Sequence, residues 1–365
     1  MLLGEVQSKC EHIASIPLQP EIAQRLHQLF LAKGALATTA IEGNTLSEDE
    51  VVRHLEGKLK LPPSKEYLGR EIDNIVQACN RILTGIAEGR PAQLDLDRIR
   101  EFDRQVLDGL ELGTDVVPGE IRQQSAGVAL YRGAPAPDCE YLIDRLCKWL
   151  NSKDFDPPAE LESRAVACGI IKAVFAHLYL AWIHPFGDGN GRTARLIEFL
   201  ILVTSGIPSP AAHLLSNHYN QTRNEYYRQL ERASASGGDV LPFLEYAVAG
   251  FVDGLRAQLI LIREQQWQVI WRDYVYEMFH DKDERADIRR RHLVLDLSAH
   301  VEPVPISKVH HISPRVAQDY ASMTARTVSR DLKVLSEMGL VEIVKKTVRA
   351  KREQILAFLP IRSES

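Results

Sequence analysis

Long stretches of the chain place apolar side chains at the spacing of helices. Residues 21–110 favour helices throughout, with few runs of β-branched residues. A continuous apolar run from Ala165 to Ile183 predicts a buried helix, and Arg195–Val203 predicts another. Further helices are expected over Glu140–Leu150 and Val240–Glu277. The sequence before residue 280 is therefore expected to fold mainly as α-helices.

One stretch of this helical region has a different pattern. Between residues 112 and 138, glycines and prolines separate short segments, which is typical of turns and loops. Ala126–Tyr131 favours one strand of a β-hairpin, and an ordinary surface loop is the alternative. We expect a small hairpin inside an otherwise α-helical fold.

The C-terminal residues alternate short helices with strands. Ile306–Val316 and 317–323 predict a short helix and a turn. Thr324 can cap a following helix, whose apolar positions are Val328, Leu332 and Leu335. After this helix, Val341–Val344 and Ile355–Leu359 are expected to form two strands. The charged run 280–291 ahead of this segment predicts a solvated helix face or a linker.

Basic residues concentrate on this C-terminal segment. The polar face of the helix after Thr324 carries Arg326, Arg330 and Lys333, and the expected hairpin tip carries Lys345, Lys346, Arg349, Lys351 and Arg352. The order of elements resembles the winged-helix domains of bacterial regulators, which implies DNA binding through residues 324–352. Such domains also serve in protein docking or dimerisation, so a protein partner and a homodimer stay open.

Length and composition fit several soluble domains. The chain has 365 residues, 45% of them hydrophobic, and a net charge of −5, so no global basic bias points to nucleic acid. Its five cysteines form no C-x-x-C pair, which favours free thiols in a reducing cytoplasm. The first residues do not resemble a signal peptide, and no uncharged apolar stretch of membrane-spanning length is found. We expect a cytoplasmic protein without membrane contact.

These patterns suggest four regions. An N-terminal helical region occupies residues 1–110, and a catalytic domain occupies residues 111–250. Residues 251–284 are expected to form a helical linker, and residues 285–365 a small α/β domain. The fold class is therefore all-α in the main, with one β-hairpin, followed by a small α/β domain.

The segment from His184 to Arg195 concentrates the chemistry. Pro185 ends the preceding helix, and the glycines at 187, 189 and 191 let the backbone turn its N–H groups toward an anion. Arg192 and Arg195 are three residues apart, on one face of the next helix, where their guanidinium groups can bind phosphate oxygens. Asp188 suits Mg²⁺, and His184 suits proton transfer from a hydroxyl group.

Other motifs fit these residues poorly. A calcium loop counted from Asp188 would place Arg192, Thr193 and Phe199 where a ligand, a glycine and a bidentate glutamate are required. A Walker loop would need Gly-Lys-Ser/Thr, which the segment lacks. A capped glycine turn remains the simplest structural alternative.

The segment resembles the signature of the Fic family, His-Pro-Phe-x-Asp/Glu-Gly-Asn-Gly-Arg-x-x-Arg, at every specified position. The resemblance implies a helical Fic fold and transfer of AMP from ATP to a hydroxyl side chain of a target protein. His184 would be the general base, Asp188 the Mg²⁺ ligand and Phe186 a core anchor for the loop. The nucleotide contacts implied by the resemblance are Gly189, Asn190, Gly191 and Arg192 for the α- and β-phosphates, Arg195 for the γ-phosphate, and the intervening Thr193 and Ala194.

A second segment carries a possible regulator of this site. Gly43 follows an expected helix, which leaves Glu42 at the negative end of the helix dipole, where a carboxylate needs a nearby cation. Thr38 and Glu42 match the inhibitory helix of Fic proteins, Ser/Thr-x-x-x-Glu-Gly/Asn. The resemblance implies that Glu42 pairs with Arg195 and occupies the place of the γ-phosphate; a surface glutamate is the alternative.

The resemblance also suggests partners for substrate and nucleotide. The segment 122–137 is similar to the family's flap, which aligns a target protein by strand addition. Tyr226 and Tyr227 match an aromatic region near the adenine, although tyrosines at helical spacing are usually core residues. His177 lies in an apolar helix and is expected to be a hydrogen-bonded core residue.

Three functions share these residues. The first is an autoinhibited, Mg²⁺-dependent protein adenylyltransferase, which can also modify itself. The second is a DNA-binding regulator whose nucleotide site senses ATP. The third is removal of AMP from a modified protein, with Glu42 orienting water. The intact base and metal ligand favour transfer over sensing, and the sequence does not separate transfer from removal.

Overall fold

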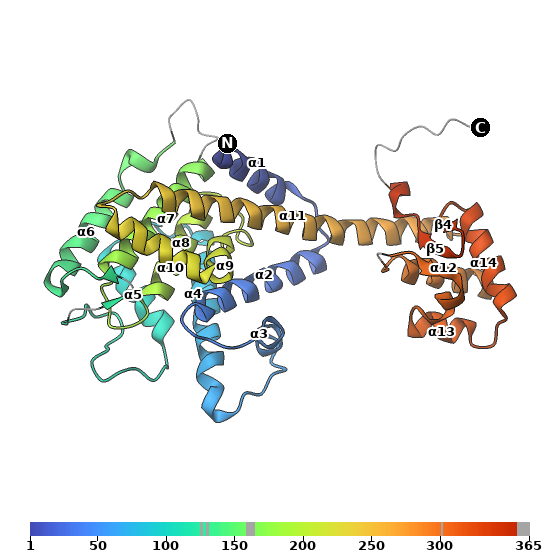
Figure 1. Cartoon of the computed structure of the whole chain (residues 1–365), viewed down its shortest axis with the longest axis horizontal. Helices are drawn as coiled ribbons and strands as arrows, with labels where there is room; N and C mark the ends of the chain where they lie inside the picture. Colours follow the sequence, from blue (N-terminus) through green and yellow to red (C-terminus); the bar gives the residue numbers. More distant parts are fainter. Residues whose placement is uncertain (125–126, 129–130, 158–164, 301, 356–365) are drawn as a thin grey trace. The chain divides into compact units, whose positions relative to one another are not determined.

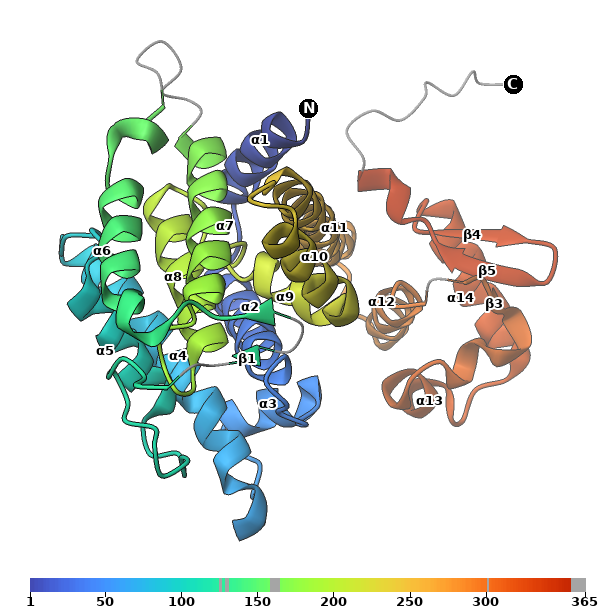
Figure 2. The same cartoon turned by 60° about the vertical axis from the view of Figure 1, so that its left-hand side comes forward.

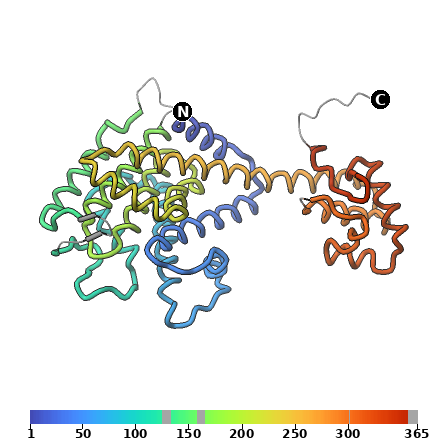
Figure 3. The backbone as a smooth tube through the Cα atoms, viewed as in Figure 1, coloured from blue at the N-terminus to red at the C-terminus, as the bar shows by residue number. Residues whose placement is uncertain are grey.

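The computed structural model describes residues 1–124, 127–128, 131–157, 165–300 and 302–355. The chain divides into two compact units, Met1–Ile260 and Leu261–Ser365, each with its own hydrophobic core. Figure 3 follows the backbone through both units and marks in grey the residues outside the described ranges. Each unit is described by itself.

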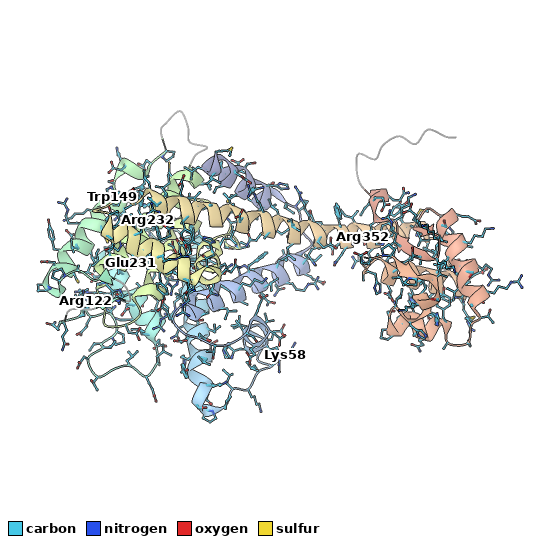
Figure 4. The ribbon with its side chains drawn as sticks, viewed as in Figure 1. Lys58, Arg122, Trp149, Glu231, Arg232 and Arg352 are labelled. Atoms are coloured by element: carbon cyan, nitrogen blue, oxygen red, sulfur yellow. The ribbon has the colours of Figure 1, made fainter. Side chains whose placement is uncertain are left out.

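The first unit is almost entirely helical, as the sequence predicts (Figure 1). Capping residues set several helix starts: Ser47 forms a capping box with Glu50, and the Asp95 side chain accepts a hydrogen bond from the backbone N–H of Arg98. Its elements before the hairpin are α1 (Leu2–Ser15), α2 (Pro20–Ala40), α3 (Glu48–Leu55), η1 (Pro63–Lys65), α4 (Glu66–Ala87) and α5 (Leu96–Leu107). Figure 4 labels Lys58 in the segment between α3 and α4.

The second half of this unit begins with a hairpin. Strands β1 (Gly127–Val128) and β2 (Tyr131–Arg132) pair antiparallel, with Gly127 opposite Arg132. The predicted single strand over residues 126–131 is therefore wrong in extent, because Val128 and Tyr131 belong to two different strands and pair with each other; residues 126, 129 and 130 lie outside the described ranges. The helices that follow are η2 (Ala136–Asp138), α6 (Cys139–Leu150), η3 (Lys153–Phe155), α7 (Ala165–Ile183), α8 (Asn190–Thr204), α9 (Leu214–Gln221), α10 (Arg223–Ala235) and α11 (Leu241–Met278).

Helices α7 and α8 form the centre of the first unit. They lie side by side, and α8 also packs against α2, α4 and α5 (Figure 2). A single apolar cluster runs from Val6 through Ile170 and Leu200 to Leu255. Residues 1–110 and 111–250, treated as separate regions above, therefore share one core. This packing brings the segment after α2 to the N-terminus of α8.

Helix α7 shows why apolarity alone does not indicate a membrane span. It is 19 residues long with a mean hydropathy of 1.8, so its length and composition would allow it to cross a membrane. Two-thirds of its apolar window is buried inside the protein, however, and the helix contains Lys172. Burial lowers the pKa of the Lys172 ammonium group. The helix is part of the core of the first unit.

The second unit combines helices with a small sheet. The sheet has the order β3-β5-β4, and all neighbouring strands are antiparallel. Val328, Leu332 and Leu335 are buried, as the sequence predicts for the helix after Thr324. Besides the end of α11, the elements are α12 (Arg285–Leu297), β3 (Val304–Pro305), η5 (Ile306–His311), α13 (Pro314–Tyr320), α14 (Ala325–Glu337), β4 (Val341–Val344), β5 (Thr347–Ala350) and η6 (Arg352–Ile355).

Two sequence predictions for this unit are wrong. The strand that returns from β4 is Thr347–Ala350 and not Ile355–Leu359, because Lys345 adopts a φ of 55° and closes the hairpin at once. Ile355 ends η6, and residues 356–359 lie outside the described ranges. The charged run 280–291 is only partly solvated, since Arg289 is buried against Asp331.

Candidate active site

The signature segment is a short loop held between two helices. Gly189 precedes α8 with a φ of +79°, and a Cβ there would lie 2.7 Å from Asp103 Oδ1. Asn190 fixes the loop, because its side chain accepts a hydrogen bond from the Phe186 N–H and donates one to the Phe186 carbonyl, both at 2.9 Å. Phe186 is fully buried in the core, as expected for an anchor. The backbone at the start of α8 is thereby held in a fixed conformation.

His184 stands at the entrance of this loop in a strained conformation, with a φ of 49°. Its carbonyl accepts a 2.7 Å hydrogen bond from Arg122 Nε, and its N–H donates to the Leu180 carbonyl at 2.9 Å. Burial, and then the charge of Arg122, lower the pKa of His184 to about 4. The imidazole is therefore neutral near pH 7 and can accept a proton.

Arg195 meets the carboxylate that the sequence predicts. Its Nη2 donates to Glu42 Oε1 at 2.6 Å and to the Thr38 carbonyl at 2.9 Å. Burial would raise the pKa of Glu42, but the charge and hydrogen bond of Arg195 outweigh it and hold that pKa below its usual value. Glu42 follows the C-terminus of α2, so Arg195 supplies the cation that the helix dipole requires.

Gly191 makes this contact sterically allowed. A Cβ at Gly191 would lie 2.1 Å from Glu42 Oε1, so any larger residue would require the Glu42 carboxylate to move. Glu42 therefore sits against the N-terminal turn of α8, where an anion is stabilised by backbone N–H groups and the dipole. Arg195 Nε and Nη1 are buried and have no hydrogen-bond partner in the described part of the chain.

Arg192 is also held by carboxylates. Its Nη1 donates to Glu71 Oε1 at 3.1 Å, and its Nη2 donates to Asp188 Oδ1 at 3.0 Å. Arg192 is almost fully buried, whereas half of the Asp188 side chain is exposed. The loop thus presents two buried guanidinium groups, an exposed carboxylate and a neutral imidazole around the start of one helix.

Comparison with known proteins shows what this arrangement is similar to. Residues 93–202, which include the whole loop, match the family model described as Fic/DOC family. This part of the chain, which carries the candidate site, is similar to the Fic/DOC family.

Curated Fic proteins resemble parts of this chain. The chain is 32% identical over 212 residues to protein adenylyltransferase fic-1 of Caenorhabditis briggsae, covering 57% of this chain and 37% of that protein. It is 26% identical over 245 residues to protein adenylyltransferase Fic of Nematostella vectensis, covering 67% and 52% respectively. The chain therefore spans about a third to a half of the length of these relatives.

Solved Fic structures share the fold. A Fic family protein from Desulfovibrio desulfuricans G20 superposes with a TM-score of 0.58 at 18% identity, over 96% of this chain and 94% of that one. Fic-1 from C. elegans superposes with a TM-score of 0.57 at 24% identity, over 72% of each chain. Both likenesses support the mainly α-helical Fic fold.

The residues predicted for the Fic site divide into two groups. His184, Asp188, Arg192, Arg195 and Glu42 converge as described above. Thr193 and Ala194 are fully buried, and the Thr193 hydroxyl lies 3.4 Å from Asp103 Oδ1, so they offer no exposed side chain to a nucleotide. Thr38 contributes its carbonyl to Arg195.

The two tyrosines predicted to lie near the adenine differ in burial. Tyr226 is buried, and its hydroxyl hydrogen-bonds His177 Nε2 at 2.8 Å within the core. His177 in turn lies 3.1 Å from Glu198 through Nδ1, which agrees with its predicted core role. Tyr227 is half-buried and donates a long hydrogen bond to the Ile41 carbonyl. Contact with the adenine stays a prediction for both tyrosines.

Sequence reasoning missed Arg122, which is labelled in Figure 4 and joins the Fic loop to the flap through hydrogen bonds. Besides the His184 carbonyl, Arg122 donates to the carbonyls of Gln124 and Ala134, one on each side of the hairpin. An isolated bridge between Ile121 and Phe186 adds to the connection. Nothing in the local sequence around Arg122 indicates this role.

Asp103 and Glu71 were missed for the same reason. Asp103, on α5, is fully buried and accepts a 2.8 Å hydrogen bond from the Gly119 N–H. Burial raises its pKa to about 7. Glu71 reaches Arg192 from α4, 121 residues earlier in the chain. Only the packing of α4 and α5 against α8 brings these carboxylates to the loop.

The site can accommodate a magnesium ion carried by a nucleotide. No cluster of three or more His, Cys, Asp or Glu ligands occurs among the described residues. Asp188 is a half-exposed carboxylate next to the anion site, and Mg²⁺ commonly binds through one carboxylate together with substrate phosphates. Asp188 thus fits such an ion, whereas a metal cage made only by the protein is not found in these ranges.

Proposed function

We propose that this chain is a protein adenylyltransferase, which transfers AMP from ATP to a hydroxyl side chain of a target protein and is inhibited by Glu42. The observation that carries the proposal is the contact of Glu42 with Arg195 over Gly191, since a carboxylate there occupies an anion site at a helix N-terminus. Curated relatives named protein adenylyltransferases support the same activity.

The proposed reaction needs one base and a phosphate clamp. The hydroxyl oxygen of the target bonds to the α-phosphorus, the bond from this phosphorus to the bridging oxygen of the β-phosphate breaks, and pyrophosphate leaves. His184, neutral near pH 7, accepts the hydroxyl proton. Arg192 and Arg195 stabilise the phosphate charge. Mg²⁺ held by Asp188 would neutralise further charge on the phosphates.

The inhibition follows from competition for one guanidinium group. Arg195 donates to Glu42 and is the proposed ligand of the γ-phosphate, and the two anions cannot occupy the same space. Removing the Glu42 side chain frees Arg195, whose Nε and Nη1 carry no other hydrogen bond in the described ranges. ATP then binds in the orientation required for transfer.

The same proposal includes where the target protein docks and where in the cell the chain acts. The target segment docks on the flap 122–137, which Arg122 ties to the base at His184. Modification of the chain by itself uses the same hydroxyl chemistry. All five cysteines are free thiols, which is consistent with the cytoplasm.

Incubation with Mg²⁺ and ATP labelled at the α-phosphate tests the activity. We expect Glu42→Gly to label protein at least about tenfold faster than wild type, since one tenfold step needs only ~1.4 kcal/mol. Glu42→Gly/His184→Ala should lose this label, and Glu66→Gly, which removes an exposed glutamate from α4, should behave as wild type.

The alternatives predict different outcomes in that experiment. Absence of label from Glu42→Gly, with ATP binding intact, would favour the nucleotide-sensing regulator. Release of AMP from a modified protein by wild type, lost in Glu42→Gln, would favour the de-AMPylating hydrolase.

We also propose duplex DNA as a ligand of the second unit, whose helices and three-stranded sheet resemble a winged helix. Arg349 and Arg352 are engaged by glutamates, so fewer cations are free than the sequence suggests. The exposed basic residues that remain are Arg326, Arg330, Lys345 and Lys346, together with Lys333, which makes only a long, exposed contact with Glu337. We expect the full chain to bind DNA with a log-log salt slope of about −3 to −4, and Lys345→Glu/Lys346→Glu to bind weakly. Salt-independent binding, or none at low salt, would refute this.

A further inference from the structure

Arg192 has both terminal nitrogens occupied by carboxylates from different elements. Glu71 on α4 accepts from Nη1 at 3.1 Å, and Asp188 in the loop accepts from Nη2 at 3.0 Å. Arg192 Nε is buried without a hydrogen-bond partner in the described ranges. Each terminal nitrogen keeps a second N–H, so a phosphate oxygen can still bind Arg192, but it then shares the guanidinium charge with both carboxylates.

The two carboxylates are held very differently. Asp188 is half exposed and can turn toward a metal ion, whereas the Glu71 side chain is only 13% exposed. Asn44 Nδ2 donates to Glu71 Oε2 at 2.9 Å and to the Leu68 carbonyl at 2.9 Å, which fixes Glu71 from its other side. Glu71 is therefore the carboxylate that competes with a phosphate.

Asn44 also connects Glu71 to the inhibitory segment. It is buried, lies two residues after Glu42, and accepts a hydrogen bond from the Leu46 N–H at 3.1 Å. One amide side chain thus links the carboxylate on Arg192 to the segment whose carboxylate binds Arg195. The Glu71 contact of Arg192 and the Glu42 contact of Arg195 are therefore connected through Asn44.

The local charge balance disfavours a further anion beside Arg192. Three carboxylates, Glu42, Glu71 and Asp188, surround two guanidinium groups. Burial raises the pKa of Glu71, and the charges of Asp188 and Glu42 raise it further. A cavity of about 1170 Å³ is lined by Glu71, Asp188 and Arg192, so a phosphate that reaches Arg192 through it also comes near the Glu71 carboxylate.

We propose that Glu71 is a second competing carboxylate, which occupies Arg192 and lowers the affinity of the site for the diphosphate part of a nucleotide. The inference rests on the proposed nucleotide site. Glu42 governs the γ-phosphate through Arg195, and Glu71 governs the α- and β-phosphates through Arg192. Replacing Glu42 is therefore expected to change the affinity for ATP alone, whereas replacing Glu71 is expected to change the affinities for both ADP and ATP.

Calorimetric titration of the full chain with ADP, ATP and adenosine, in the presence of Mg²⁺, tests the assignment. We expect Glu71→Gln to bind ADP and ATP about five- to tenfold more tightly than wild type, because a competing charge is removed. Adenosine, which has no phosphate, should bind both proteins equally. The matched control Glu66→Gln, an exposed glutamate on α4 that lines the same cavity, should leave all three affinities unchanged.

The inhibitory glutamate, Glu42, supplies an independent comparison. Glu42→Gln should tighten ATP binding and leave ADP binding unchanged, whereas Glu71→Gln tightens both. If Glu71→Gln does not fold, Glu71→Ala gives the same test, since it also removes the competing carboxylate from Arg192.

Two results are decisive. Unchanged or weaker ADP binding by Glu71→Gln would overturn the proposal, because Glu71 would then only orient Arg192. Failure of Glu42→Gly to transfer AMP would overturn the proposed activity instead, and tighter ADP binding by Glu71→Gln would still establish Glu71 as a competitor for phosphate.

Discussion

Both units of the chain bury arginines against carboxylates, but they satisfy these groups to different degrees. In the second unit, Asp331 is fully buried and accepts hydrogen bonds from Arg289, Arg290 and the Tyr320 hydroxyl at 2.8 to 3.0 Å. Both of its oxygens are used. The cluster links α12, α13 and α14, and the Arg289 guanidinium also lies 5.3 Å from the Tyr320 ring centroid.

The arginines of the Fic site are incompletely satisfied by comparison. Arg195 uses only Nη2, and its Nε and Nη1 have no hydrogen-bond partner in the described part of the chain. Buried polar groups are normally paired, because an unpaired buried donor costs about 1–3 kcal/mol. The open donors of Arg195 therefore indicate a place for a ligand, whereas the closed cluster around Asp331 indicates a structural role.

The largest effect that separates the two clusters is expected at Asp331. Asp331→Asn leaves Arg289 without a counter-charge and Arg290 with Asp287 alone, and breaking a buried ion pair in this way costs about 3–5 kcal/mol. Hydrogen exchange of the full chain should show faster exchange in α12 and α14 and no change in α7 and α8. Glu337→Gln, in the same helix, removes a long, exposed contact with Lys333 and should change exchange little.

The comparison fails if Asp331 is not structural. Unchanged protection of α12 and α14 in Asp331→Asn would show that the closed cluster contributes no more than an exposed ion pair.

The sequence predicted those parts of the site that depend on local geometry. The loop from His184 to Arg195 was recognisable because its glycines, base and arginines are close in the chain, and the structure places them together. Glu42 was predictable because a carboxylate at a helix C-terminus needs a cation, and Arg195 supplies it at 2.6 Å.

Residues that reach the site through packing had no local signal. Glu71 and Arg122 are single charged residues in ordinary surroundings, and their role depends on how α4 and the flap pack against the loop. The same limit explains the misplaced strand after β4. Ile355–Leu359 has the higher β-propensity, but the turn at Lys345 pairs Thr347–Ala350 with β4 first.

Asp103 in the first unit can be compared directly with Asp331 in the second. Both carboxylates are fully buried, but Asp103 has no salt-bridge partner among the described residues. Its oxygens meet the Gly119 N–H and the Thr193 hydroxyl, and its pKa is raised to about 7, chiefly by burial. A folded-state pKa above the unfolded value of about 4 means that folding favours the neutral acid. The cost is absent below about pH 4, grows as the pH rises and is complete above about pH 7.

Asp103→Asn should therefore stabilise the first unit in alkaline solution, where Asp331→Asn destabilises the second. An amide keeps an acceptor for the Gly119 N–H and carries no charge, so we expect a gain of about 1–3 kcal/mol at pH 8 and almost none at pH 4. Urea unfolding, monitored through hydrogen exchange in α5 and α8, measures this difference. Glu101→Gln, an exposed carboxylate on the same helix, should show no such pH dependence. Equal stability of Asp103→Asn and wild type at both pH values would mean that Asp103 titrates normally, and that a buried carboxylate beside the Fic loop is tolerated without a cation.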